Sequence, residues 1–222
     1  MNIWSGFKPA SCFPDKCQCE AVRDAVIRQP SAFISSVAYI FAGVCIYRHV
    51  ADKTFELKLW TFVCVLMGIS SHLGHASFTN VFLAMDFASI VLIISFFALL
   101  NFLRLLKVQH GKIILIFIFY YALLYLAMYS MGKWAKIGMC LLIFFFSLGD
   151  MIREMGMRFF KARDLQLSLG ILTISFGLFL LDENHIGCSP HSWFQFHSLW
   201  HIGTAVAIYF YGRWRFEEMR AR

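Results

Sequence analysis

Charged residues are scarce in this sequence, and with them the polar surface that a soluble globule needs. Only 15% of the 222 residues are Asp, Glu, Lys or Arg, whereas 59% are hydrophobic and 18% are aromatic. Soluble domains average about 25% charged residues, so a soluble fold of this composition would expose large apolar patches and aggregate. Intrinsic disorder is excluded too, because it requires low hydrophobicity and few aromatic residues.

Alternation of apolar and polar residues in segments of about ten, typical of a transmembrane β-barrel, is also missing. The sequence has no internal repeat, no low-complexity tract and no long linker. It has instead continuous apolar runs of about 20 residues, the length that a helix needs to cross a bilayer. We therefore expect an all-α membrane protein, a seven-transmembrane-helix bundle, with spans at residues 31–50, 57–76, 81–102, 112–131, 135–152, 164–182 and 193–212.

The first 30 residues are polar and rich in cysteine, and they lack the apolar stretch of a signal peptide. We expect residues 1–30 to form an extramembrane segment and residues 31–213 to form one membrane domain. Residues 214–222 are expected to form a basic cytoplasmic tail.

Lys and Arg residues are distributed unevenly over the loops, which indicates the orientation in the membrane. With seven spans, the N-terminus and the even-numbered loops share one side, and six basic residues lie there: Lys8, Lys16, Arg23, Arg28, Lys133 and Lys136. The other fourteen lie on the C-terminal side: Arg48, Lys53, Lys58, Arg104, Lys107, Lys112, Arg153, Arg158, Lys161, Arg163, Arg213, Arg215, Arg220 and Arg222. Because basic residues stay preferentially in the cytoplasm, we expect a cytoplasmic C-terminus and a periplasmic or lumenal N-terminus. Anionic lipids at the cytoplasmic face, and not nucleic acid, are then the expected partner of the net charge of +7.

Polar residues gather where three of the expected spans end or begin. The second span ends with Ser71 and His75, which lie four residues apart and so share a helix face. The third span opens with Asp86, and the seventh opens with His197 and His201, again four apart. Because the second span runs outward and the third and seventh run inward, all five residues are expected at one depth near the outer side. Ionisable residues inside spans are costly and mark functional sites.

Three neutral imidazoles with one open position form a recurring catalytic zinc site. We therefore expect His75, His197 and His201 to bind zinc, which lowers the pKa of a bound water strongly. Asp86 would balance the charge and accept a proton from that water. Ser71 would donate a hydrogen bond to the oxyanion that forms when a carbonyl is attacked.

Two neighbouring residues compete for these roles. His72 lies three residues before His75, and Ser70 precedes Ser71; we favour Ser71 and His75 because they are one i,i+4 step apart. A single histidine in a span is as often a hydrogen-bonded packing residue as a ligand. The combination of a serine, an aspartate and three histidines at one depth favours a metal site over separate packing residues.

This set of residues resembles a known group of membrane enzymes. Ser71-x3-His75, then Asp86 eleven residues on, and His197-x3-His201 in the last span are similar to the motifs of the CREST superfamily of seven-span hydrolases. Within that superfamily, the pattern looks most like the alkaline ceramidase family. The resemblance implies that the histidines bind zinc and that Ser71 and Asp86 assist the attacking water. It also implies that the substrate is ceramide, whose amide is cleaved to a fatty acid and a sphingoid base.

The same resemblance implies a calcium site in the N-terminal segment. Asp15, Gln18, Glu20 and Gln29 can be laid over the family's pattern of carboxylate and amide ligands. Two acidic ligands of that pattern are replaced here by glutamine, whereas calcium prefers several carboxylate oxygens. A weakened or absent site, and a plain solvated cap on the bundle, are therefore alternatives.

The cysteines leave the disulfide pairing open. An oxidising outer compartment permits one disulfide on that side, and Cys188 is a candidate partner in it. The cysteines expected on that side are Cys12, Cys17, Cys19 and Cys188. Three others fall in spans and are expected to be packing residues: Cys45, Cys64 and Cys140.

The leading hypothesis is a zinc-dependent integral-membrane amidase that hydrolyses a ceramide-like N-acyl sphingoid lipid. One alternative is a lipid-sensing receptor of the progestin and adiponectin receptor type, which shares the zinc motif. Another is a related CREST hydrolase that acts on an ester or a phospholipid. A transporter is disfavoured, because transport sites lie near the bilayer midplane and these polar residues lie at one end of their spans. The oligomeric state stays open.

Overall fold

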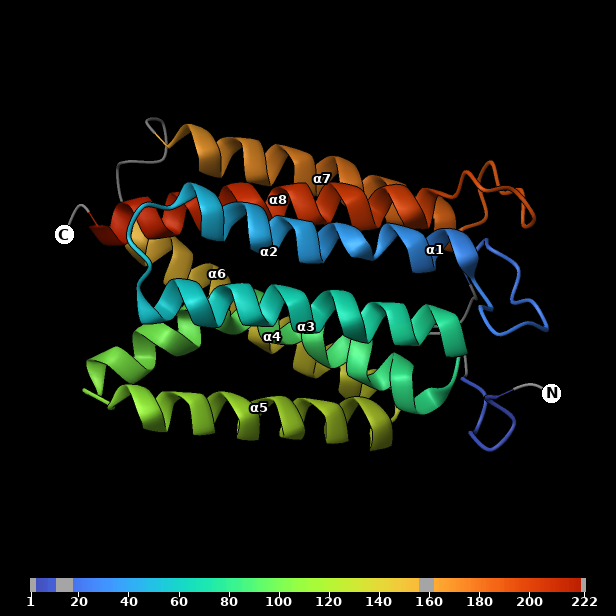
Figure 1. Ribbon diagram of the computed structural model, residues 1–222, viewed down its shortest axis with the longest axis horizontal. Coiled ribbons are helices and arrows are strands. Elements are labelled where there is room, and N and C mark those ends of the chain that lie inside the picture. The colour runs from blue at the N-terminus through green and yellow to red at the C-terminus, as the bar shows by residue number, and fades with distance from the viewer. Residues whose placement is uncertain (1–2, 11–17, 156–161, 221–222) are drawn as a thin grey trace.

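Helices make up nearly all of the regular structure of this chain. The computed structural model describes residues 3–10, 18–155 and 162–220. Figure 1 shows the helices side by side along the long axis, with the first described residues (blue) at one end and the last turns of α8 (Phe196–Arg220, red) at the other. The described residues hold no strand, only an isolated antiparallel bridge between Pro9 and Thr79. The expected all-α fold is confirmed.

Six segments of the described chain are long and apolar enough to cross a membrane. They are formed by α1 and α2 together and by α3 to α7, and they coincide with the first six expected spans. The multi-pass membrane character is therefore confirmed. The helices before α8 are α1 (Pro30–Ser35), α2 (Val37–His49), α3 (Phe55–Ser77), α4 (Asn80–Leu105), α5 (His110–Ser130), α6 (Lys133–Met155) and α7 (Arg163–Glu183).

The first expected span is divided into α1 and α2 at Ser36. Pro30 opens α1 in its first turn, where its missing N–H costs nothing. The hydroxyls of Ser35 and Ser36 both donate to the carbonyl of Ala32, at 3.0 and 2.8 Å. Serine hydroxyls that bond back to the preceding turn bend helices, so these two serines account for the break.

α8 extends further than the seventh expected span. We expected residues 193–212, and the helix runs from Phe196 to Arg220. Residues 214–220, expected as part of a separate basic tail, continue the helix instead. The reason is packing, because three successive residues in this last part are buried: Trp214, Arg215 and Phe216.

α8 is also less apolar than the other long helices, and it is not one of the six segments that qualify as spans by composition. Its length of 25 residues is sufficient to cross a bilayer. His197, His201 and several hydroxyl-bearing residues lower its mean hydropathy. The residues that we expect to bind a metal are thus among those that weaken its signal as a span.

The helices pack as neighbours around a common core. α8 contacts α7 on one side and α2 on the other; α3 lies between α2 and α4, and both α5 and α6 pack on α4. Trp60 and Phe96 are fully buried in the core, with their ring centroids 5.0 Å apart. Gly212 lets α8 approach closely, because a Cβ there would collide with Ile46 and with the ring of Trp60.

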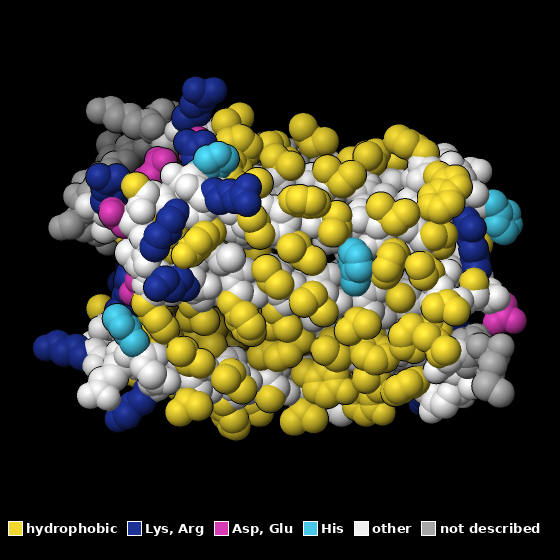
Figure 2. Space-filling view, viewed as in Figure 1, with side chains coloured by type: hydrophobic (Ala, Val, Ile, Leu, Met, Phe, Trp, Pro, Cys, Tyr) yellow, Lys and Arg dark blue, Asp and Glu magenta, His cyan; other side chains and the backbone are white. Residues whose placement is uncertain are grey.

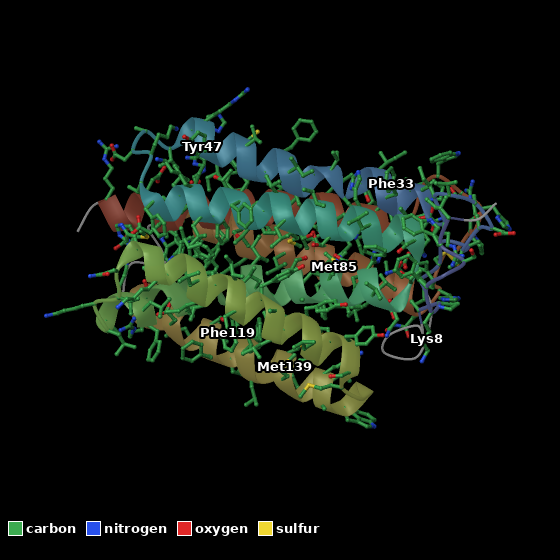
Figure 3. All side chains as sticks on the ribbon, turned by 60° about the horizontal axis from the view of Figure 1, so that its bottom comes forward. Lys8, Phe33, Tyr47, Met85, Phe119 and Met139 are labelled. Carbon is green, nitrogen blue, oxygen red and sulfur yellow. A yellow bond between two sulfur atoms is a disulfide. The ribbon has the colours of Figure 1, made fainter. Side chains whose placement is uncertain are left out.

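Hydrophobic side chains cover the middle of the molecule, and charges gather at its ends. In Figure 2 most of the visible Lys and Arg side chains lie at the end reached by the last turns of α8. In Figure 3 the labelled Lys8 and Phe33 lie toward the opposite end, and Tyr47 lies toward the basic end. We call these two ends the histidine end, where α3 finishes and α8 begins, and the basic end.

Candidate metal centre

Three histidines converge inside the bundle near the histidine end. His75 comes from the last turn of α3, and His197 and His201 come from the first two turns of α8. One ring nitrogen from each lies within 4.8 Å of those of the other two. The ring centroids are 5.2, 5.0 and 4.5 Å apart. The side chains are almost fully buried, with exposed fractions of 0%, 5% and 3%.

Two ring nitrogens of this cluster have no hydrogen-bond partner within the described ranges of the chain. The Nδ1 atom of His75 lies 2.8 Å from the side-chain oxygen of Gln29, which accepts its hydrogen. The Nε2 atom of the same ring therefore carries a lone pair, and among the described residues it has no hydrogen-bond partner; neither has Nδ1 of His197. A buried polar atom without a partner costs about 1–3 kcal/mol. A bound cation would remove this cost, and neutral imidazoles suit zinc.

His201 is oriented by the serines at the break between α1 and α2. Its Nδ1 atom lies 2.9 Å from the hydroxyl of Ser35 and 3.4 Å from that of Ser36. Because the Ser35 hydroxyl donates its own hydrogen to the carbonyl of Ala32, its oxygen is free to accept the Nδ1 hydrogen. The Nε2 atom of His201 is then left unprotonated, as a metal ligand must be.

A carboxylate and a hydroxyl lie beside the histidines. The Oδ2 atom of Asp86, near the start of α4, is 3.9 Å from the Nε2 atom of His75. The side chain of Ser71 lies next to Asp86, and its hydroxyl is 2.9 Å from the hydroxyl of Ser36. Asp86 is 7% exposed and Ser71 is 1% exposed. The structure thus brings together all five residues that the sequence singled out. The reason is that the last turn of α3 and the first turns of α4 and α8 lie at the same end of the bundle (Figure 1).

The two competing residues point elsewhere. The ring of His72 packs against that of Phe33, with centroids 4.2 Å apart, and it is not part of the histidine cluster. The hydroxyl of Ser70 lies 3.3 Å from that of Tyr121 on α5. The face of α3 that carries Ser71 and His75 is therefore the one turned toward α8.

The residues proposed for calcium have other contacts in the structure. Both carboxylate oxygens of Glu20 accept backbone N–H groups in the first turn of α1, from Ser31 at 2.8 Å and from Ala32 at 2.9 Å. Burial raises the pKa of the Glu20 carboxyl, and these two hydrogen bonds oppose that effect. Gln29 contacts His75. The side-chain oxygen of Gln18 is buried without a partner among the described residues; Asp15 lies outside the described residues, and the calcium site stays a prediction.

Sequence reasoning missed the residues that hold the histidines in place. Ser35 and Ser36 were hidden in an apolar span, although polar residues in a span are a signal of function. Asp182, at the end of α7, accepts the backbone N–H of His197 at 3.2 Å. A disulfide joins Cys19 to Cys188, one of the pairings that the sequence left open; Cys12 and Cys17 lie outside the described residues.

Comparison of the chain with models of protein families, with characterised proteins and with solved structures found no match. The resemblance to alkaline ceramidases therefore stays an expectation drawn from short motifs. What the structure adds to those motifs is the meeting of residues from distant parts of the chain: His75 on α3, Asp86 on α4, and His197 and His201 on α8.

Proposed function

We propose that this chain is a membrane-embedded, zinc-dependent amidase that hydrolyses a ceramide-like N-acyl sphingoid lipid. The observation that carries the proposal is the cluster of three buried imidazoles, His75, His197 and His201. Two of them, His75 and His197, have a ring nitrogen without a hydrogen-bond partner among the described residues. A carboxylate, Asp86, and a hydroxyl, Ser71, lie next to that cluster. This donor set matches what hydrolysis of an acyl bond requires: metal ligands, a proton acceptor and an oxyanion donor.

Each residue has a defined role in the proposed reaction. The three histidines hold the metal, and zinc bound there would supply Lewis acidity toward water and the substrate carbonyl. Asp86 takes the proton of the attacking water and passes it toward the leaving amine. Ser71 donates a hydrogen bond to the oxygen of the attacked carbonyl as negative charge develops on it. Burial of both side chains keeps bulk water from weakening these interactions.

The surroundings of the cluster favour a lipid as the substrate. The site lies inside an apolar bundle and near one end of its helices, which matches the depth of the amide of a lipid whose headgroup stays at the interface. Acyl chains among the phenylalanine-rich helices would add about 0.8 kcal/mol of binding for each buried methylene. An amide is favoured over an ester by the likeness of Ser71-x3-His75, Asp86 and His197-x3-His201 to alkaline ceramidases.

The proposed topology has α8 as the seventh span and the C-terminus in the cytoplasm. It is supported by the length of α8 and by the gathering of Lys and Arg at the basic end (Figure 2). The histidine end then faces the periplasm or a lumen, and anionic lipids contact the basic end. A reporter fused to the C-terminus should be active only if it is cytoplasmic; an exterior C-terminus would move the site to the cytoplasmic face.

The experiment that tests the activity uses purified full-length protein in lipid nanodiscs. We expect release of fatty acid and sphingoid base from an N-acyl sphingosine, loss of this release with a zinc chelator, and its return on adding zinc. The matched control is His191→Ala, which alters an exposed histidine in the loop before α8. This variant should keep full turnover.

Zinc-loaded protein that binds N-acyl sphingoid lipids saturably and hydrolyses none of them would contradict the amidase. The receptor function would then replace it. Hydrolysis of a phospholipid or ester with no cleavage of the amide would instead support the related CREST hydrolase.

A further inference from the structure

Gln29 forms hydrogen bonds to His75 through both its backbone and its side chain. Its backbone N–H donates to the carbonyl of His75 at 3.1 Å, and its side-chain oxygen accepts from the Nδ1 atom of the ring at 2.8 Å. Gln29 is fully buried. These contacts set both the position of the ring and its tautomer, because the accepted hydrogen must reside on Nδ1.

Asp182 holds the start of the helix that carries the other two histidines. One of its carboxylate oxygens accepts the backbone N–H of His197 at 3.2 Å, and the other accepts the backbone N–H of Cys19 at 3.1 Å. The carboxylate is buried, with 1% of the residue exposed. A carboxylate at the first turn of a helix accepts a hydrogen bond from an amide that has no partner within the helix. Its negative charge also interacts favourably with the positive end of the helix dipole. Asp182 therefore holds the first turn of α8 against α7.

These two contacts meet on one dipeptide of the N-terminal segment. The side-chain nitrogen of Gln29 donates to the carbonyl of Glu20 at 3.2 Å, and Asp182 accepts from the neighbouring Cys19. The disulfide between Cys19 and Cys188 fastens this dipeptide to the loop between α7 and α8. The extramembrane segment and the two helices that carry the histidines thus form one connected unit.

We propose that Gln29 and Asp182 are positioning residues for the metal centre, joined through Cys19 and Glu20 so that the extramembrane segment sets the zinc affinity. The inference rests on the proposed zinc site and extends it. Groups that hydrogen-bond to the second nitrogen of a ligating histidine orient the ring and raise its basicity, and their loss typically lowers metal affinity or activity about 10- to 100-fold. Gln29 has this relation to His75, and Asp182 acts through the backbone of His197.

The test measures the zinc dissociation constant of the full chain in detergent, by competition with a chromophoric chelator and without any lipid. Gln29→Ala removes the acceptor, and we expect an affinity loss of about 10- to 100-fold. Gln29→Glu keeps an acceptor oxygen for the ring but loses the N–H that Gln29 donates to the carbonyl of Glu20, and it should restore part of the affinity. The matched control is Gln195→Ala, which removes another buried amide whose partners are the carbonyls of Ser189 and Ser192; its affinity should equal that of the wild type.

A second pair of variants examines the other contact. Asp182→Ala should weaken zinc binding, and Asp182→Asn, which keeps one acceptor oxygen, should fall between Asp182→Ala and the wild type. Replacing Cys19 and Cys188 together by serine should weaken binding in the same direction. Thermal unfolding of the metal-free variants separates the two roles, because a purely structural residue lowers stability and leaves the zinc affinity unchanged.

Gln29→Ala and Asp182→Ala proteins that fold and bind zinc as tightly as the wild type would overturn the inference. So would a wild-type chain that binds no zinc, an outcome that also removes the proposed metal centre. Wild-type protein that binds zinc but cleaves no N-acyl lipid refutes the amidase alone, and the affinity series then still decides whether the two residues position the ligands.

Discussion

The two ends of the bundle both bury polar side chains, but they satisfy them differently. At the basic end, Asp150 on α6 accepts from Asn101 on α4 at 2.9 and 3.1 Å and from Arg153 at 3.0 Å. Its other neighbour is Arg215 of α8, at 3.6 Å. At the histidine end, the Nε2 atom of His75 and the Nδ1 atom of His197 are buried and have no hydrogen-bond partner in the part of the chain that the structure describes.

At the basic end, charged side chains pair with one another and link neighbouring helices. The guanidinium of Arg215 also stacks on the ring of Phe97, 4.7 Å from its centroid. Although its Nε atom has no hydrogen-bond partner among the residues that the structure describes, its charge faces the carboxylate of Asp150. Glu56 of α3 and Arg104 of α4 form a second pair at 2.8 Å. Polar groups that satisfy one another join helices, whereas the three buried histidines at the other end form a group that could hold a metal ion.

The largest expected effect comes from removing two ligands at the histidine end. The double variant His197→Ala, His201→Ala should lose its zinc, because one histidine and a carboxylate do not make a structural or catalytic zinc site. Metal analysis should find about one zinc per chain in the wild type and His191→Ala, and almost none in the double variant. Unchanged zinc content would show that the ring nitrogens converge for another reason.

Asp86→Asn should separate metal binding from turnover. The variant keeps all three histidines and so most of its zinc, but it has no carboxylate to take the proton from water. A positioned acid or base contributes about 10²- to 10⁴-fold to a rate, and we expect a loss in that range. The measurement pairs zinc content with the rate of fatty acid release; loss of zinc along with the rate would assign Asp86 to the metal instead.

Ser71→Ala should have a smaller effect on turnover. Removing a single oxyanion donor costs about 10²- to 10³-fold in rate, and the zinc content should not change. Ser70→Ala is the matched control, because the adjacent hydroxyl faces Tyr121 instead of Asp86. Steady-state rates with one N-acyl lipid decide the matter, and equal losses in the two variants would argue against a specific role for Ser71.

Asp150→Asn should leave zinc content and catalytic chemistry unchanged while it destabilises the fold. Breaking a buried ion pair by removing one partner costs about 3–5 kcal/mol. Asp52→Asn is the control, because its pair with Arg220 is well exposed, at 60% and 71% of the two side chains, and exposed pairs contribute only about 0–1 kcal/mol. Thermal unfolding in detergent measures both; zinc loss in Asp150→Asn would erase the contrast between the two ends.

Much of the architecture could be predicted from the sequence because the relevant signals are local. Apolar runs of about 20 residues indicate spans by their length alone, and the first six segments lie where these runs predict them. The predicted end of α8 was wrong. Charged residues such as Arg215 are typical of a cytoplasmic tail, and only burial against Asp150 and Phe97 keeps this part of the chain helical.

For the metal centre, the sequence by itself determined which residues share a helix face. Four-residue spacing places Ser71 beside His75, and His197 beside His201, in any α-helix. That spacing favoured His75 over His72, but only the tertiary structure decided that the face of α3 with His75 turns toward α8. Helical periodicity relates residues within one helix and carries no information about the neighbour that each face will meet.

The supporting contacts depended on the tertiary structure entirely. Gln29 meets His75 across 46 positions of the chain, and the disulfide joins cysteines 169 positions apart. Asp182 and Ser35 reach the histidines of α8 only because α7 and α1 pack beside that helix. Such contacts arise from the shape and packing of whole helices, and so the candidate ligands were visible in the sequence while the residues that orient them were not.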